Sequence, residues 1–179
     1  MPRSSKHAFA LIELLVVISI ITLLVGLMLP VLSQVRSAGQ RIACLSNLRQ
    51  VGIGFEAYRI DFNNRMPAVQ AMPVLPDEPS LMDVMEGYLD AAKIWQCPAD
   101  DSSFAENGTS YEYFMGYYLI FTQGSADYND LLRELHAIES IMPVLTDADG
   151  WHPNGPGGTS ANALFLDGRA DWFHVTGDD

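Results

Sequence analysis

The chain begins with a long run of apolar residues that no charge interrupts. From Leu14 to Leu32 it contains no Asp, Glu, Lys, Arg or His. A helix rises about 1.5 Å per residue, so this run is long enough to cross a hydrocarbon layer of about 30 Å. Glu13 lies at the head of the run, and a carboxylate at that depth is costly unless it has a partner and a role. The pattern therefore predicts one membrane-spanning helix in which Glu13 is functional.

Beyond this run the pattern changes to the period of an amphipathic helix. Apolar residues recur three and four positions apart over residues 35–55, with arginines between them. We expect the helix to continue to about Phe62, because the segment 63–67 contains two asparagines and a proline, which are stop signals. Pro30 removes one backbone hydrogen bond, so a kink is expected there rather than an end.

The remaining residues predict short helices and strands after a proline-rich connection at 66–79. Helices are expected at 81–92, with Ser80 as N-cap, and at 127–139. Strands are expected at 111–122, broken or bulged at Gly116, and at 141–146, 161–167 and 169–175, the last two joined by a tight turn at Asp167-Gly168. The predicted fold class is α+β, with the long helix packed on a mainly antiparallel sheet.

Charge and cysteine content narrow the function. Asp and Glu number 22 against 10 Lys and Arg, and the net charge of -12 argues against binding to nucleic acid. Arg3 and Lys6 precede the apolar run, which predicts a cytoplasmic N-terminus and an acidic domain outside the cytoplasmic membrane. Cys44 and Cys97 are an even pair that could form one disulfide in an oxidising compartment; two separate thiols are the alternative.

Three interpretations compete for the N-terminus. A cleaved secretory signal needs an apolar core of roughly 7 to 15 residues, and this one is longer. A plain signal anchor leaves Glu13 unexplained. Phe9 followed by ALIELLVVISII resembles the signal of type IV pilins and type II secretion pseudopilins, with Ala8 where that family prefers Gly. The resemblance implies cleavage between Ala8 and Phe9, N-methylation of Phe9 and a role for Glu13 in assembly.

The same resemblance implies a layout and partners. The layout is a leader at 1–8, a transmembrane and assembly helix at 9–32, its amphipathic continuation at 33–65 and a globular pilin-like domain at 66–179. The implied partners are a prepilin peptidase, copies of the chain or related pilins or pseudopilins, an assembly platform and membrane lipid. The implied function is a structural filament subunit. The alternative is a membrane-anchored extracytoplasmic binding module that does not assemble.

Two segments of the domain resemble elements of bacterial pilin-like proteins. Cys97-Pro98-Ala99-Asp100 is similar to a Cys-Pro-x-Asp segment, and His152 with Asp167-Gly168 is similar to a C-terminal His-x9-Asp-Gly element. Here fourteen residues separate the histidine from the aspartate. An insertion in the loop NGPGGTS would account for the difference.

His152 has two interpretations. Asp147, Asp149 and Asp167 are calcium candidates, since Asp-x-Asp-Gly is similar to a calcium loop, but the twelfth residue from Asp147 is Gly158 and not the Glu of an EF-hand. A loop histidine that binds backbone carbonyls and pins the hairpin is favoured, and no other cofactor is expected.

Catalysis finds little support in the sequence. A triad of Thr159 or Ser160 with His152 and Asp167 has no nucleophile elbow. We therefore expect the protein not to be an enzyme.

Overall fold

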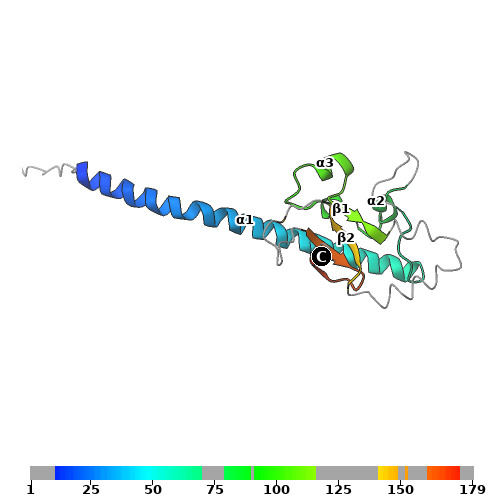
Figure 1. Ribbon diagram of the computed structural model, residues 1–179. Coiled ribbons are helices and arrows are strands. Elements are labelled where there is room, and N and C mark those ends of the chain that lie inside the picture. Colours follow the sequence, from blue (N-terminus) through cyan, green and yellow to red (C-terminus); the bar gives the residue numbers. More distant parts are fainter. Residues whose placement is uncertain are drawn as a thin grey trace, which may run out of the picture. The chain divides into compact units, whose positions relative to one another are not determined.

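The computed structural model describes residues 11–69, 79–89, 91–115, 141–148, 152 and 161–173. The chain divides into two compact units, Met1–Ala38 and Gly39–Asp179, which we describe separately. Helix α1 (Leu11–Asp61) contributes residues to both (Figure 1). The predicted long N-terminal helix is therefore confirmed, and it ends one residue before Phe62.

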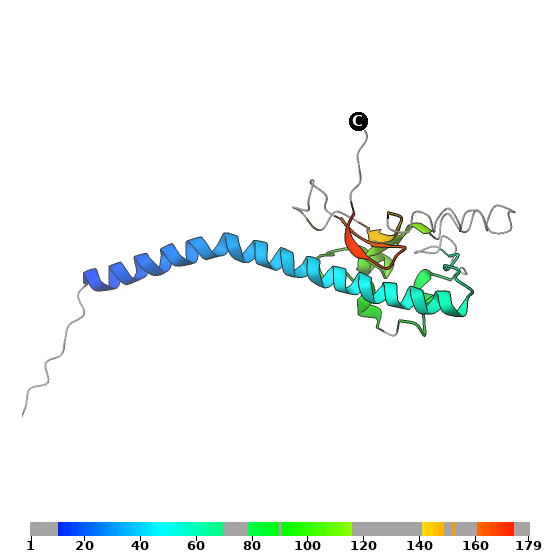
Figure 2. The same ribbon diagram turned by 90° about the horizontal axis from the view of Figure 1, so that it is seen from below.

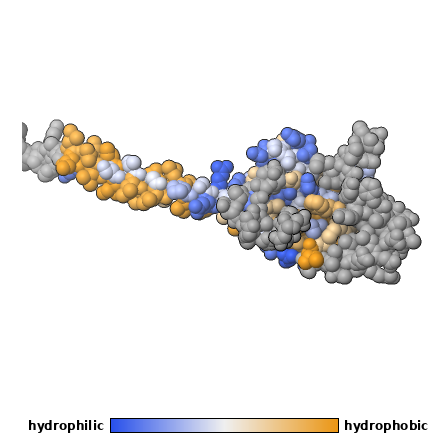
Figure 3. All heavy atoms as spheres, viewed as in Figure 1, coloured by the Kyte–Doolittle hydropathy of each residue, from blue (hydrophilic) through white to orange (hydrophobic). Residues whose placement is uncertain are grey.

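In the first unit, α1 presents apolar side chains on all sides. Its most apolar stretch has no buried residue, and the helix is long and apolar enough to cross a membrane (Figure 3). The hydroxyls of Ser19 and Thr22 each donate to a carbonyl four residues earlier, both at 2.7 Å. Polar groups satisfied inside the helix suit a lipid environment. Pro30 lies inside α1 and does not end it.

In the second unit, one face of α1 is buried in the domain core. The buried residues are Cys44, Leu45, Leu48, Val51, Gly52, Gly54, Phe55 and Tyr58. Their spacing of three and four confirms the amphipathic pattern expected for this half of the helix. After Asp61 the chain reverses through Asn63 and Asn64, which have φ of 53° and 62°. Asparagine adopts this left-handed conformation more readily than most residues, which explains the stop.

Within the described residues the sheet has four antiparallel strands in the order β1-β2-β3-β4. They are β1 (Tyr111–Tyr113), β2 (Pro143–Asp147), β3 (Ala161–Phe165) and β4 (Ala170–Phe173). Figures 1 and 2 show the strands beside the C-terminal half of α1. Val144, Leu145 and Leu164 join the buried face of α1 in one hydrophobic core. The α+β arrangement is confirmed, and it is consistent with a pilin-like fold.

The β3–β4 hairpin differs in detail from the prediction. Gly168 N donates to Phe165 O at 2.9 Å, and Phe165 N donates to Arg169 O at 2.8 Å, so the loop has three residues rather than two. Gly168 has φ of 81°, in the left-handed region that closes such loops. β3 therefore ends at Phe165, and β4 begins at Ala170.

Two other elements are shorter than expected. Strand β1 ends at Tyr113, and the rest of the predicted strand beyond residue 115 lies outside the described residues, as do the predicted helix at 127–139 and residues 174–175. Helix α2 (Leu81–Val84) has the predicted cap at Ser80, but it stops long before residue 92. Gly87, with φ of 94°, leaves the helical conformation there. The 3-10 helix η1 (Ala92–Trp95) and helix α3 (Ser103–Asn107) had no counterpart in the predicted elements.

The cap of α2 makes stability depend on pH. Asp83 Oδ2 accepts from Ser80 N at 2.8 Å and from Ser80 Oγ at 2.6 Å, and these bonds lower the pKa of Asp83. A carboxylate whose pKa is lower in the folded state than in the unfolded state contributes stability at pH values above its unfolded pKa. This contribution is lost as the pH falls through the folded pKa. Asp83→Asn should therefore lower the melting temperature at pH 7, with a smaller difference below about pH 3. Equal shifts at both pH values would contradict this, and Glu86→Gln, at an exposed carboxylate, is the control.

A substitution at Gly54 tests how closely α1 packs against Leu89. A Cβ at this position would lie 2.6 Å from Leu89 Cγ, whereas one at Gly39 would meet nothing within 4 Å. Gly54→Ala should therefore cost about 1 to 3 kcal/mol of unfolding free energy through overpacking. Gly39→Ala should stabilise by up to about 1 kcal/mol through helix propensity. Denaturant unfolding of both variants in detergent measures the contrast, and equal effects would refute it.

Candidate functional site

The N-terminal site is only partly described. Glu13 lies exposed in the first turn of α1, where a carboxylate interacts favourably with the helix dipole. Ala8 and Phe9, the predicted cleavage position, lie outside the described residues. The processing and assembly roles assigned to these three residues therefore stay predictions.

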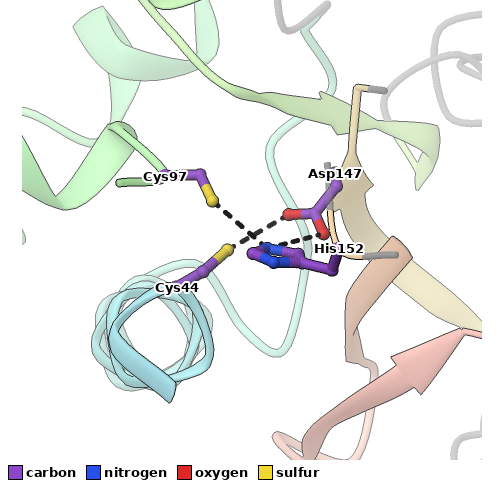
Figure 4. A group of neighbouring side chains, drawn as sticks. All are labelled: Cys44, Cys97, Asp147 and His152. Carbon is purple, nitrogen blue, oxygen red and sulfur yellow. Dashed lines mark hydrogen bonds and ion pairs between the residues drawn. The ribbon is translucent and has the colours of Figure 1, made fainter. Parts of the chain in front are cut away.

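A second site lies inside the domain core. Figure 4 shows Cys44, Cys97, Asp147 and His152 turned toward one another. Their ligand atoms all lie within 4.8 Å of one another, and all four residues are buried. Cys44 comes from the buried face of α1, Cys97 from the segment after η1, and Asp147 from the last position of β2. We call this group of four residues the donor cluster.

Short contacts connect each sulfur to one of the other two residues. The Cys44 thiol donates to Asp147 Oδ1 at 3.1 Å, and Cys97 Sγ lies 3.3 Å from His152 Nε2. His152 Nε2 also lies 3.5 Å from Asp147 Oδ2. The Tyr111 hydroxyl is 3.5 Å from Cys44 Sγ at the edge of the donor cluster. Four polar side chains from distant parts of the sequence thus form one compact group.

Burial and the mutual contacts change the acidity of the donor cluster. Interaction with the neighbouring Cys44 thiol, together with His152, lowers the pKa of Cys97 to about 5 although burial opposes it. The same pairing, together with burial, raises the pKa of Cys44. Burial raises the pKa of Asp147 to about 6, opposed by hydrogen bonds from Asn162 and Cys44. Of the two thiols, Cys97 is therefore the one that loses its proton more readily.

Hydrogen bonds with neighbouring residues fix the side chain of Asp147 and the backbone of Cys97. Asn162 of β3 donates to Asp147 Oδ2 from its backbone N at 2.6 Å and from Nδ2 at 3.1 Å. Cys97 N donates to Ser110 Oγ at 3.0 Å, and Ser110 Oγ in turn donates to Asp100. The Cys-Pro-x-Asp segment is therefore a compact turn that holds Cys97 in the donor cluster.

Several predicted site residues are in other surroundings than expected. His152 was expected to bind backbone carbonyls and pin the hairpin, but it is buried against Cys97 and Asp147 instead. Asp167 lies at the β3–β4 hairpin, 3.9 Å from Arg169 Nε, at the opposite end of β3 from Asn162 and Asp147. The structure thus does not bring Asp147 and Asp167 together as calcium ligands, and it does not pair His152 with Asp167. Asp149 lies outside the described residues.

The sulfur atoms of the two cysteines lie within 4.8 Å of each other, and both thiols are free in the structure. The disulfide stays a prediction. Sequence reasoning did not foresee that both cysteines share a site with Asp147 and His152. The sequence offered one signal for such a site: the chain has only two Cys and four His, so few residues with sulfur or imidazole side chains could form it.

Comparison with known families bears on the N-terminus. A family model described as the prokaryotic N-terminal methylation motif matches residues 3–29. The chain carries a prepilin-type signal. This signal implies processing by a prepilin peptidase and assembly with other pilins, and it indicates a structural protein rather than an enzyme. No curated protein and no solved structure matches the chain. The likeness to a C-terminal His-x9-Asp-Gly element stays a prediction.

A substitution of Asp100 tests whether the Cys-Pro-x-Asp turn fixes the position of Cys97. Its carboxylate accepts from the backbone N atoms of Ser102, Ser103 and Phe104 at 2.8 to 2.9 Å, at the start of α3. Asp100→Ala should cost about 1 to 2 kcal/mol of unfolding free energy, as expected for loss of a helix cap. It should also speed alkylation of Cys97, measured by mass spectrometry of the labelled peptide. Asp101→Ala, at the exposed neighbour, is the control, and equal effects of the two changes would rule out this role.

Proposed function

We propose that the chain is a structural subunit of a type IV pilus or a type II secretion pseudopilus, made as a prepilin and assembled through its N-terminal helix. The observation that carries the proposal is the methylation motif at residues 3–29. The exposed apolar surface of α1 from Leu11 to Val35 supports it. In a filament, helices of neighbouring subunits would cover that surface by close packing.

Processing would prepare the chain for assembly. Cleavage after Ala8 leaves a positive amine on Phe9, four residues before Glu13. In a bundle of subunits this amine can pair with the Glu13 carboxylate of a neighbour, so that two charges offset each other in apolar surroundings. Apolar packing then supplies affinity, and the pairing selects the register. The peptidase is a separate membrane protein, and this chain is its substrate.

Before assembly the subunit would be a single-pass protein of the cytoplasmic membrane. Arg3 and Lys6 favour a cytoplasmic N-terminus, which leaves the acidic domain outside. Its partners would be copies of itself or related pilins or pseudopilins, an assembly platform and membrane lipid. The filament would extend into the periplasm or from the cell surface, where the negative charge of the domain favours solubility.

Intact mass of the membrane-extracted chain tests the processing step. Co-expression of the full chain with an active prepilin peptidase should give a product that starts at Phe9 and carries one added methyl group. Omitting the peptidase should leave the chain starting at Met1. A chain that still starts at Met1, while the same peptidase cuts another prepilin in the same cells, would refute cleavage after Ala8.

Two variants of the apolar helix test the assembly step. Glu13→Leu should be inserted and cut, yet fail to enter filaments, because the amine of Phe9 loses its partner. Thr22→Val is the matched control, since the Thr22 hydroxyl bonds Ile18 O of its own helix. The fraction of chain recovered in sheared or cross-linked filaments is the measurement. Equal assembly of Glu13→Leu and the parent would contradict the role of Glu13, and a parent that is never found in filaments would favour the membrane-anchored binding module.

A further inference from the structure

We infer that Cys44, Cys97, Asp147 and His152 bind a single Zn²⁺ ion that ties the long helix to the sheet. The inference does not depend on filament assembly, because all four residues lie within the unit Gly39–Asp179. It rests on the kinds of donor atom that meet in the core, on their separations and on the residues that hold them.

The donor set selects zinc over other common cations. Two sulfurs, one imidazole nitrogen and one carboxylate oxygen converge in the donor cluster. Zinc in proteins is bound by these three ligand types, usually four at a time in a tetrahedron. Calcium and magnesium prefer oxygen ligands throughout, so two thiols in a set of four select against both.

The separations are close to those of a tetrahedral site. Zinc lies about 2.3 Å from sulfur and about 2.0 to 2.2 Å from nitrogen or oxygen, which places neighbouring ligand atoms about 3.3 to 3.8 Å apart. The observed contacts between ligand atoms are 3.1 Å from Cys44 Sγ to Asp147 Oδ1 and 3.3 Å from Cys97 Sγ to His152 Nε2, and all four ligand atoms lie within 4.8 Å of one another. Since the widest tetrahedral separation is about 3.8 Å, shifts of up to about 1 Å would admit the ion.

Residues next to the donor cluster orient its side chains by hydrogen bonds, as the residues that surround the ligands of a metal site commonly do. Asn162 bonds Asp147 Oδ2 twice, which leaves Oδ1 facing Cys44 Sγ. Ser110 fixes the backbone of Cys97. Ligating carboxylates in metal sites are commonly oriented by such hydrogen bonds.

A Cys44–Cys97 disulfide is the competing explanation, and it accounts for less. It would use the two sulfurs and leave Asp147 and His152 as a buried pair, with Asp147 still bonded to Asn162. Each sulfur instead lies within 3.3 Å of one of these two residues, so that all four donors form one set. Zinc would satisfy the four together, and both thiols would be bound as thiolates.

The site would be structural. Four protein ligands fill a tetrahedral zinc ion and leave no position for a substrate, and all four are buried. The ion would join α1, the turn after η1, and the end of β2. Binding energy in such a site is folding energy, because the unfolded chain does not hold the ligands together.

Metal content and thiol reactivity of the full chain provide the test. Protein purified from membranes in detergent, without chelator, should contain one zinc ion per chain. Its two thiols should resist alkylation until a strong chelator is added, and its intact mass should show no disulfide. Cobalt added to the stripped protein should give the visible absorption of a tetrahedral site together with thiolate charge-transfer bands. The cobalt spectrum reports on the parent chain and does not depend on whether a variant folds.

Variants identify the ligands. His152→Ala and Asp147→Asn should each weaken zinc binding by more than about a hundredfold in competition with a chromophoric chelator, and Asn162→Ala by about 10- to 100-fold, as outer partners do. Asp167→Asn, at the hairpin, is the matched control and should bind zinc as the parent does. Millimolar calcium should neither displace the zinc nor raise the melting temperature of the stripped protein.

Three results would overturn the inference. The first is a Cys44–Cys97 disulfide in metal-free protein taken from its native membrane. The second is a stripped, reduced chain that shows neither a cobalt spectrum nor a rise in melting temperature with zinc. The third is zinc binding that His152→Ala and Asp147→Asn leave unchanged, which would place the ion elsewhere.

Discussion

The domain depends on the close approach of α1 to the sheet. A Cβ on Gly52 would lie 2.9 Å from Leu164 Cδ1, so the side chain of Leu164 in β3 packs directly against the helix backbone. This approach places the buried side chains of the helix and of β2 and β3 in a single core. Arg41 reinforces it nearby, since its guanidinium lies 3.8 Å from the Trp172 ring centroid of β4. The same packing brings Cys44 within reach of Asp147, and the donor cluster exists only because of it.

Most of the fold could be predicted because its signals are long or local. The helix carries an uninterrupted apolar run and then a regular period of three and four, and each signal extends over many turns. The Asp167-Gly168 pair marks the hairpin correctly, but a dipeptide does not reveal whether two or three residues form the loop. Helix α2 was predicted too long because its apolar spacing continues past its end at Val84, whereas Gly87, with its positive φ, cannot continue a helix. The prepilin-type signal is also local, since Phe9 and Glu13 are only four residues apart.

The donor cluster could be predicted only in pieces. Cys44, Cys97, Asp147 and His152 each attracted attention in the sequence, but under three unrelated hypotheses: a disulfide, a calcium loop and a hairpin pin. The contacts that unite them join residues 55 and 103 positions apart, and such contacts follow from tertiary packing rather than from spacing. His152 was paired with Asp167 because a motif gives only the order of residues along the chain. In space, His152 contacts Asp147 near the start of β3, whereas Asp167 lies at the hairpin beyond the end of β3.

The continuity of α1 has a mechanical consequence. The helix runs without a break from Leu11 to Asp61, and Cys44 is its first buried residue. Tension applied to the apolar part of the helix would therefore enter the domain at the turn that contains Cys44. The hydrogen-bond partners of Cys44 are Asp147 of β2 and Tyr111 of β1, so the load would be shared between two strands. The contacts of this turn would therefore help to keep α1 bound to the domain core when its apolar part is under tension.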